Sequence, residues 1–273
     1  MQIATRDGVK LAYSEAGRGG PPIVFIHGLA CDSSDFAPQF EYFRERHRVI
    51  AIDLRGHGAS DAPEGGYSTA ALADDVLWLC DELGVYKPML VGHSMGGMIA
   101  LEIAARRPGA ATAIALLDSP ILIPPPVAEA LAPFGAALRS PAYRDALVGF
   151  MASNFGPADD PERKGRILER AGRLPQHVGA ACWEQGLASY DSVAAARACT
   201  LPVLYLHAAV PSNLGLLAQL CPRLMVGETV GSGHWHQLEV PDQVNAMLDR
   251  FIDILQTNPA VIGQGNMAPA EAA

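Results

Sequence analysis

The sequence lacks the features that would place the protein in a membrane or on nucleic acid. It contains no run of about 18 consecutive apolar residues, so it predicts no membrane span. Charged residues make up only 18% of the chain and the net charge is −9, whereas nucleic acid and anionic membranes attract basic surfaces. The N-terminus MQIATRDGVK has no apolar stretch of signal-peptide length. We therefore expect a soluble, cytoplasmic protein with no nucleic-acid or membrane partner. The sequence does not indicate an oligomeric state.

Cysteine is also scarce and follows no pattern. The five cysteines are an odd number, are widely spaced and include no CxxC pair; they are Cys31, Cys80, Cys182, Cys199 and Cys221. Such spacing is typical of reduced thiols and not of a disulfide framework or a zinc site. The sequence also has no phosphate-binding loop and no dinucleotide fingerprint. We therefore expect neither a metal nor a cofactor.

Short apolar runs alternate with helical patterns along much of the chain. The turn pair Asp7-Gly8, between Ile3–Thr5 and Val9–Ser14, predicts a hairpin at the start. Buried strands are predicted at 22–27, 49–53, 89–91, 113–118, 202–207 and 223–226, and helices at 69–83, 95–105 and 241–256, the first with Ser68 as its N-cap. This alternation predicts an α/β fold with a mostly parallel central sheet flanked by helices.

The segment 121–198 interrupts the alternation. It begins with three consecutive prolines at 124–126 and contains helical patterns without a convincing strand. We predict a helical cap over the C-terminal edge of the sheet, where ligands of such folds bind. The α/β core would then comprise 1–120 and 199–256. The tail 257–273 is rich in proline, glycine and alanine, and we expect it to be disordered.

The strongest motif is Gly92-His93-Ser94-Met95-Gly96, which follows a predicted strand and precedes a predicted helix. This is G-x-S-x-G in the strand–turn–helix context of a nucleophile elbow. The sharp turn raises the serine hydroxyl above the sheet at a helix N-terminus, where developing negative charge is stabilised. The alternative interpretation is a glycine-rich turn with an incidental serine.

Three further motifs occur in matching order. His27-Gly28 ends an early buried strand, and 53–60 reads D-x-R-G-x-G-x-S. Residues 231–234 read G-x-G-H and are followed by Glu239 and Pro241. With the elbow, these motifs make the chain resemble the α/β-hydrolase superfamily over roughly residues 1–256. The resemblance implies the α/β-hydrolase fold with an inserted helical cap.

The resemblance also implies the partners of Ser94. A serine hydroxyl needs a base, and His234 stands where the family's catalytic histidine falls, with His236 as the local competitor. The oxyanion hole would use the backbone N–H groups of Leu29 and Met95. Because these donors are backbone groups, the two assignments concern positions and not side-chain chemistry.

The acid departs from the usual pattern. In most members it follows the strand before the histidine strand, but here 206–220 contains no Asp or Glu. Asp118 ends the preceding buried strand at the same edge of the sheet, where some branches of the family place their acid. We therefore assign the acid to Asp118. The alternatives are that Asp118 caps its own loop, or that Asn213 orients the histidine as a neutral partner.

A set of Ser94, His234 and Asp118 predicts a serine hydrolase that acts on an ester, a lactone or a related acyl bond through an acyl-enzyme. Aromatic residues in the cap favour a small apolar or aromatic substrate. The candidate substrate-binding residues are His27, His93, Trp183 and Trp235, and His27 is also predicted to support the oxyanion loop. The serine nucleophile argues against the dehalogenase and epoxide-hydrolase mechanism, in which a carboxylate attacks.

Two other functions stay open at this point. Cofactor-free dioxygenases that open 3-hydroxy-4-quinolone rings also place Asp after the earlier strand and use the His–Asp pair as a base. In such an enzyme Ser94 would bind substrate without attacking it. The chain could also be a ligand receptor or an inactive relative, although its complete set of catalytic residue types argues against this.

Overall fold

The computed structural model describes residues 1–257, and its centre is an eight-stranded sheet of order β1-β2-β4-β3-β5-β6-β7-β8. Strands β1 (Gln2–Arg6) and β2 (Val9–Ala16) form the predicted antiparallel hairpin. Asp7 and Gly8 have φ angles of 50° and 84°, as a tight two-residue hairpin turn requires. Apart from Thr257, the predicted disordered tail lies outside the described residues.

The other six strands run parallel to one another and match the predicted apolar runs. They are β3 (Ile23–Ile26), β4 (Val49–Ile52), β5 (Met89–His93), β6 (Ala113–Leu117), β7 (Val203–His207) and β8 (Leu224–Glu228). In β3, Ile23 and Phe25 pack into the core on one face, and Val24 and Ile26 into the core on the other. Because both faces of the sheet are covered, the strand is apolar at every position.

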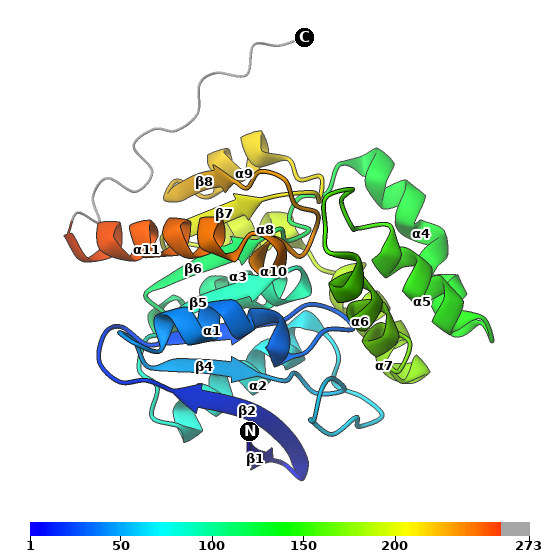
Figure 1. The fold of residues 1–273 in the computed structure, drawn as a ribbon, viewed down its shortest axis with the longest axis horizontal. Helices are drawn as coiled ribbons and strands as arrows, with labels where there is room; N and C mark the ends of the chain where they lie inside the picture. Colours follow the sequence, from blue (N-terminus) through cyan, green and yellow to red (C-terminus); the bar gives the residue numbers. More distant parts are fainter. Residues whose placement is uncertain (258–273) are drawn as a thin grey trace.

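Helices cover the two faces of the sheet (Figure 1). On one face lie α1 (Ala37–Phe43) and α11 (Pro241–Thr257). On the other lie α2 (Thr69–Glu82), α3 (Met95–Arg106), α8 (Ser192–Ala198) and α9 (Leu214–Leu220). Short helices η1 (Ser33–Phe36), η2 (Pro108–Ala110) and α10 (His236–Glu239) occupy loops. The Ser68 side chain caps α2 as predicted, accepting a hydrogen bond from the Ala71 N–H.

The segment between β6 and β7 is helical, as predicted. It contains α4 (Pro125–Arg139), α5 (Tyr143–Ala152), α6 (Pro161–Ala171), α7 (Gln176–Ala181) and the π-helical turn η3 (Cys182–Leu187). Figure 1 shows α4–α7 beyond the end of the sheet toward which the parallel strands point. Helix α8 closes the segment and packs against α3. The division into core and cap at residues 120 and 199 stays a prediction. No helix of the described residues is long and apolar enough to cross a membrane.

Candidate active site

Ser94 sits at the turn between β5 and α3 with φ 53° and ψ −122°, a backbone conformation that is strained for a residue with a side chain. Two glycines make this turn possible. A Cβ at Gly92 would lie 2.2 Å from the Gly96 carbonyl oxygen, and a Cβ at Gly96 would lie 2.0 Å from the Ile26 carbonyl oxygen. The Ser94 N–H donates to the Leu117 carbonyl at 2.9 Å, which ties the turn to β6. The local sequence therefore builds the strand–turn–helix elbow.

Asp118 and His234 come together although 116 residues separate them. The His234 Nδ1–H donates to Asp118 Oδ2 at 2.7 Å, and the Asp118 side chain is fully buried. Three backbone N–H groups also donate to this carboxylate, those of Ala208 at 2.9 Å, Ala209 at 2.9 Å and Val210 at 3.1 Å. Burial on its own raises the pKa of Asp118, but the hydrogen bonds and the charges of neighbouring histidines lower it well below its usual range. Asp118 is therefore a carboxylate that holds His234 in one tautomer.

The loop after β7 thus has an unexpected part in the site. The resemblance places the usual acid in this loop, and here the loop instead supplies backbone donors to an acid from the neighbouring strand. Asn213, the alternative partner for the histidine, has a different role because its side chain accepts a hydrogen bond from the Leu216 N–H at 2.9 Å. Asn213 therefore serves as the N-cap of α9.

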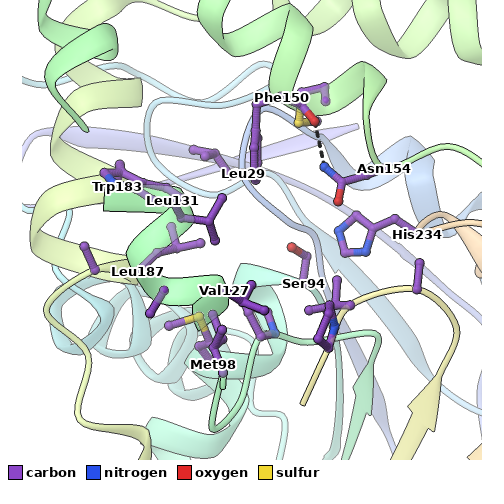
Figure 2. Close-up of a pocket in the computed structure, with 18 of the residues that line it drawn as sticks. Leu29, Ser94, Met98, Val127, Leu131, Phe150, Asn154, Trp183, Leu187 and His234 are labelled. Atoms are coloured by element: carbon purple, nitrogen blue, oxygen red, sulfur yellow. Dashed lines mark hydrogen bonds between the residues drawn. The ribbon is translucent and has the colours of Figure 1, made fainter. Parts of the chain in front are cut away.

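Ser94 and His234 both line the same cavity, and Figure 2 shows their side chains pointing into it. Because Nδ1 of His234 is engaged by Asp118, Nε2 is the nitrogen available to a proton in the cavity. No hydrogen bond joins Ser94 and His234 in the described chain. Such bonds are often long before substrate binds. The competitor His236 is fully buried, and its Nδ1 pairs with Thr229 Oγ1 at 3.0 Å, outside the cavity.

The expected oxyanion donors lie on either side of the elbow. Leu29 follows the His27-Gly28 pair and lines the cavity, and Met95 is the first residue of α3. A Cβ at Gly28 would lie 2.9 Å from the Ser94 Cβ, so the Leu29 loop packs directly on the elbow. Within residues 1–257 neither amide nitrogen donates a hydrogen bond. Both N–H groups are therefore free to receive an oxyanion.

The cavity has a volume of about 670 Å³ and lies between the sheet and the cap. Among the described residues that line it there is no Asp, Glu, Lys or Arg. Trp183 lines it and packs edge-to-face on Phe134, at 4.7 Å between ring centroids. Trp235 also lines it and stacks on Phe155 at 4.3 Å. The two expected tryptophans therefore face an apolar space of small-molecule size.

The two histidines expected to bind substrate do not line the cavity, which corrects that prediction. His27 is fully buried, and its Nδ1–H donates to the Gly28 carbonyl at 2.8 Å while its Nε2 accepts from the Leu54 N–H at 3.0 Å. It braces the oxyanion loop, and burial lowers its pKa to about 4. His93 is also fully buried, and its Nε2–H donates to the His234 carbonyl at 3.0 Å. The His27 ring therefore supports the loop that carries Leu29, and the His93 ring supports the loop that carries His234.

The cap holds the histidine loop by contacts that sequence analysis missed. The His234 N–H donates to the Asn154 carbonyl at 2.9 Å, and the Gly233 N–H donates to Asp159 Oδ1 at 2.8 Å. A Cβ at Gly233 would lie 2.4 Å from the backbone nitrogen of Gly156, so the second glycine of G-x-G-H makes room for the cap. Asn154 also lines the cavity beside His234 (Figure 2). In the sequence, the only sign of this contact with the cap was Gly233 itself, a glycine that the local turn does not explain.

Helix α6 of the cap carries two arginines that reach two catalytic loops. Arg163 pairs with Glu239 at 2.6 Å, just after the histidine loop. Arg170 pairs with both oxygens of the buried Asp35 at 2.6 Å, in the η1 turn that follows the oxyanion loop. The arginines are seven residues apart and so lie on one face of the helix. This helix therefore joins the cap firmly to both sides of the site.

The chain is similar to known proteins over most of its length. The sequence model of the alpha/beta hydrolase fold matches residues 21–241. The 2-(acetamidomethylene)succinate hydrolase of Mesorhizobium japonicum is 30% identical over 263 residues, which cover 90% of this chain and 92% of that one. Coverage of the curated relatives varies, and the chain spans only 31% of another.

Solved structures of similar proteins superpose over most of the chain. Est816, described as an N-acyl homoserine lactone degrading enzyme, has a TM-score of 0.82 and 29% identity, and covers 92% of this chain and 100% of its own. The enol-lactonase from Burkholderia xenovorans LB400 has a TM-score of 0.81 and 27% identity, with the same coverage of both chains.

Proposed function

We propose that this chain, which belongs to the alpha/beta hydrolase fold family, hydrolyses an ester, lactone or related acyl bond of a small apolar or aromatic substrate. The observation that carries the proposal is the buried Asp118–His234 pair at the cavity that Ser94 lines. The names of similar proteins, among them a lactone-degrading enzyme and an enol-lactonase, support the same class of reaction. In this assignment Ser94 is the nucleophile and His234 is the base.

The first half-reaction forms an acyl-enzyme. Ser94 Oγ attacks the carbonyl carbon of the substrate while His234 Nε2 takes the hydroxyl proton. The resulting imidazolium is stabilised by the Asp118 carboxylate at 2.7 Å. The carbonyl oxygen becomes an oxyanion that accepts hydrogen bonds from the N–H groups of Leu29 and Met95. The bond to the leaving oxygen then breaks, and His234 returns the proton to that oxygen.

The second half-reaction releases the acid. A water molecule gives a proton to His234 Nε2 and attacks the ester carbon of the acylated Ser94. The same two backbone N–H groups stabilise the second oxyanion. When the bond to Ser94 Oγ breaks, His234 returns the proton to the serine. The products are a carboxylic acid and an alcohol, or a single hydroxy acid from a lactone.

The cavity lining favours a substrate that is uncharged around its acyl group. A carboxylate or phosphate buried there would need a cation or several donors to replace its water. The described lining residues include no lysine or arginine, and most are aliphatic or aromatic. The proposed substrates are therefore neutral esters and lactones.

A panel of p-nitrophenyl esters and neutral lactones tests the proposal. The wild-type protein should hydrolyse at least one of them and should be labelled by a serine-directed phosphonate. Ser94→Ala should lose both properties. The matched control is Ser153→Ala, because Ser153 also lines the cavity but its hydroxyl donates to the Phe150 carbonyl at 2.7 Å. Full activity in Ser94→Ala would overturn the serine mechanism.

A cofactor-free dioxygenase is the second candidate, because Asp118 follows β6 and its pair with His234 does not involve Ser94. In that reaction the pair would remove the proton of a substrate hydroxyl before oxygen attacks. Oxygen uptake with a 3-hydroxy-4-quinolone that persists in Ser94→Ala would favour it. A protein that neither turns over any of these compounds nor reacts with the phosphonate would be a receptor or an inactive relative.

A further inference from the structure

Tyr190 borders two separate hollows of the molecule. One is the catalytic cavity. The other, named here the outer cleft, has a volume of about 440 Å³ and is lined by residues of α2, α3, η3 and α8, including Glu102, Arg106 and Gln185. Of the described residues that line these two hollows, Tyr190 is the only one common to both. Its position makes it the part of the wall that faces both sides.

Helix α3 forms a floor that runs beneath both hollows. Ser94, Met98 and Glu102 follow one another at four-residue steps, which places them along one face of the helix at about 6 Å per step. Ser94 and Met98 line the catalytic cavity, whereas Glu102 lines the outer cleft. The two hollows therefore lie end to end along α3. The boundary between them falls one to two helical turns beyond Ser94.

A single chain segment separates the hollows above this floor. It begins in the π-helical turn η3, and its residues divide between the two hollows. Leu187, Ala188 and Ser192 line the catalytic cavity, and Gln185, Ser189 and Asp191 line the outer cleft. The partition is therefore only one chain thick. Its bulk between the two hollows comes from the Tyr190 ring.

The Tyr190 ring stands between the two hollows, and its hydroxyl interacts with Glu102 of α3. The Tyr190 hydroxyl is buried, and the polar group that acts on it is the carboxylate of Glu102, which lines the outer cleft. Burial and the nearby Glu102 carboxylate raise the pKa of Tyr190, so the phenol stays neutral. The apolar face of a neutral ring is a suitable end wall for an apolar chain.

The mechanism decides which part of the substrate meets this wall. His234 protonates the leaving oxygen, so the leaving group lies on the His234 side of the cavity. The acyl group must then extend to the other side. Figure 2 shows Trp183 and Leu187 on the side of the cavity away from His234. Since Leu187 belongs to the partition, the acyl chain runs toward Tyr190.

We propose that Tyr190 is a specificity-determining residue that closes the acyl end of the catalytic cavity and limits the length of linear acyl chain that can be presented to Ser94. This inference rests on the proposed function. It further names the substrates as esters or lactones of short and medium linear acids. Removal of the ring would join the cavity to the outer cleft and admit longer chains.

The test compares kcat/KM for p-nitrophenyl acetate, butyrate, octanoate, dodecanoate and palmitate. Wild-type activity should fall steeply at the longer esters. Tyr190→Ala should raise the ratio of dodecanoate to acetate activity by about tenfold or more, mainly through a lower KM for the long ester. Tyr190→Leu should give an intermediate shift, and it serves as the test if the alanine variant does not fold.

Two controls separate the ring from its surroundings. Tyr190→Phe keeps the ring and should keep the wild-type profile. Ser189→Ala changes a neighbour that lines only the outer cleft and should also keep it. An unchanged profile in folded Tyr190→Ala and Tyr190→Leu, or an equal shift in Ser189→Ala, would overturn this inference and leave the proposed function intact. A wild-type protein inactive toward every ester would overturn both.

Discussion

Replacement of Asp118 by asparagine examines the catalytic assignment with the least change in shape. The amide can sit in only two orientations. In one, its carbonyl oxygen takes the place of Oδ1 and accepts from the three backbone N–H groups of 208–210, as Oδ1 does now. In the other, the NH₂ group would face those three donors. The first orientation is strongly preferred, and it points the NH₂ group at His234.

That orientation reverses the hydrogen bond to the histidine. The amide is a donor where the carboxylate is an acceptor, so His234 must present an unprotonated Nδ1 and carry its proton on Nε2. An Nε2–H cannot take the proton of Ser94. The same exchange in the serine-protease triad lowers kcat by about 10⁴, which corresponds to roughly 5.5 kcal/mol of transition-state stabilisation. We expect a loss of that order for Asp118→Asn.

The assay is kcat/KM on the best ester or lactone, with circular dichroism to verify the fold. Asn213→Ala is the matched control, because Asn213 lies in the loop after β7, which also supplies the backbone donors to Asp118, but its own side chain only caps α9. It should keep nearly full activity. Activity of Asp118→Asn within about tenfold of wild type would refute the role given to Asp118. A severe loss in Asn213→Ala would point to the neutral partner instead.

The stability of the wild type relative to Asp118→Asn should also depend on pH. Because the pKa of folded Asp118 is depressed, its contribution is fully present above the unfolded value of about 4 and is lost as the pH falls toward the folded pKa. Asparagine has no such titration. At neutral pH Asp118→Asn should be less stable by about 2 kcal/mol, the value of a charged hydrogen bond. Urea unfolding should show that the difference in free energy of unfolding between the wild type and Asp118→Asn becomes smaller below about pH 4. A stability difference that becomes larger in this acidic range would contradict the depressed pKa of Asp118.

The remaining predictions concern stability and are all checked by urea unfolding. Arg170→Ala leaves the buried Asp35 carboxylate without its cation and should cost about 3–5 kcal/mol. Arg173, just past the end of α6, forms an exposed ion pair with Glu169 of that helix, and Arg173→Ala should cost under about 1 kcal/mol. Equal losses in the two variants would show that the Arg170 pair is no stronger than a surface pair. Gly96→Ala should cost more than about 3 kcal/mol or prevent folding, since a Cβ would collide with the backbone of β3. Gly165→Ala, at an exposed open position inside α6, should instead stabilise by about 0.5–1 kcal/mol, and tolerance of both changes would refute the steric account of the elbow.

Local pattern was enough to predict most of the fold. Strand β3 is apolar at each position because both faces are covered, and a run such as Ile23–Ile26 carries that information within four residues. The Ser68 cap and the Asp7-Gly8 turn are equally local. Prediction failed where the role of a residue depends on whether its side chain reaches the cavity or is buried behind the cavity wall. His27 and His93 lie close in sequence to Leu29 and Ser94, yet their side chains are fully buried and do not line the cavity.

The elbow is what the sequence determined by itself. The G-x-S-x-G pattern and its place between a strand and a helix can be recognised from the residues around Ser94 alone, although the reason for Gly96 is a close contact with Ile26 of β3. Because the segment 206–220 contains no Asp or Glu, the sequence also pointed to Asp118 as the acid. The sequence therefore identified the candidate site residues, but it did not predict the hydrogen bonds between them.

Tertiary structure decided how the distant groups combine. The order β5-β6-β7 brings the ends of three strands to one edge, so that Asp118 meets both His234 and the backbone donors after β7. The hydrogen bond from Gly233 to Asp159 of the cap joins segments far apart in the chain. The same holds for the partition at Tyr190, which separates hollows lined by several distant segments. Such contacts depend on how the sheet is ordered and how the cap packs on it. Neither leaves a local periodic signal, and for that reason the composition of the cavity became visible only in the folded chain.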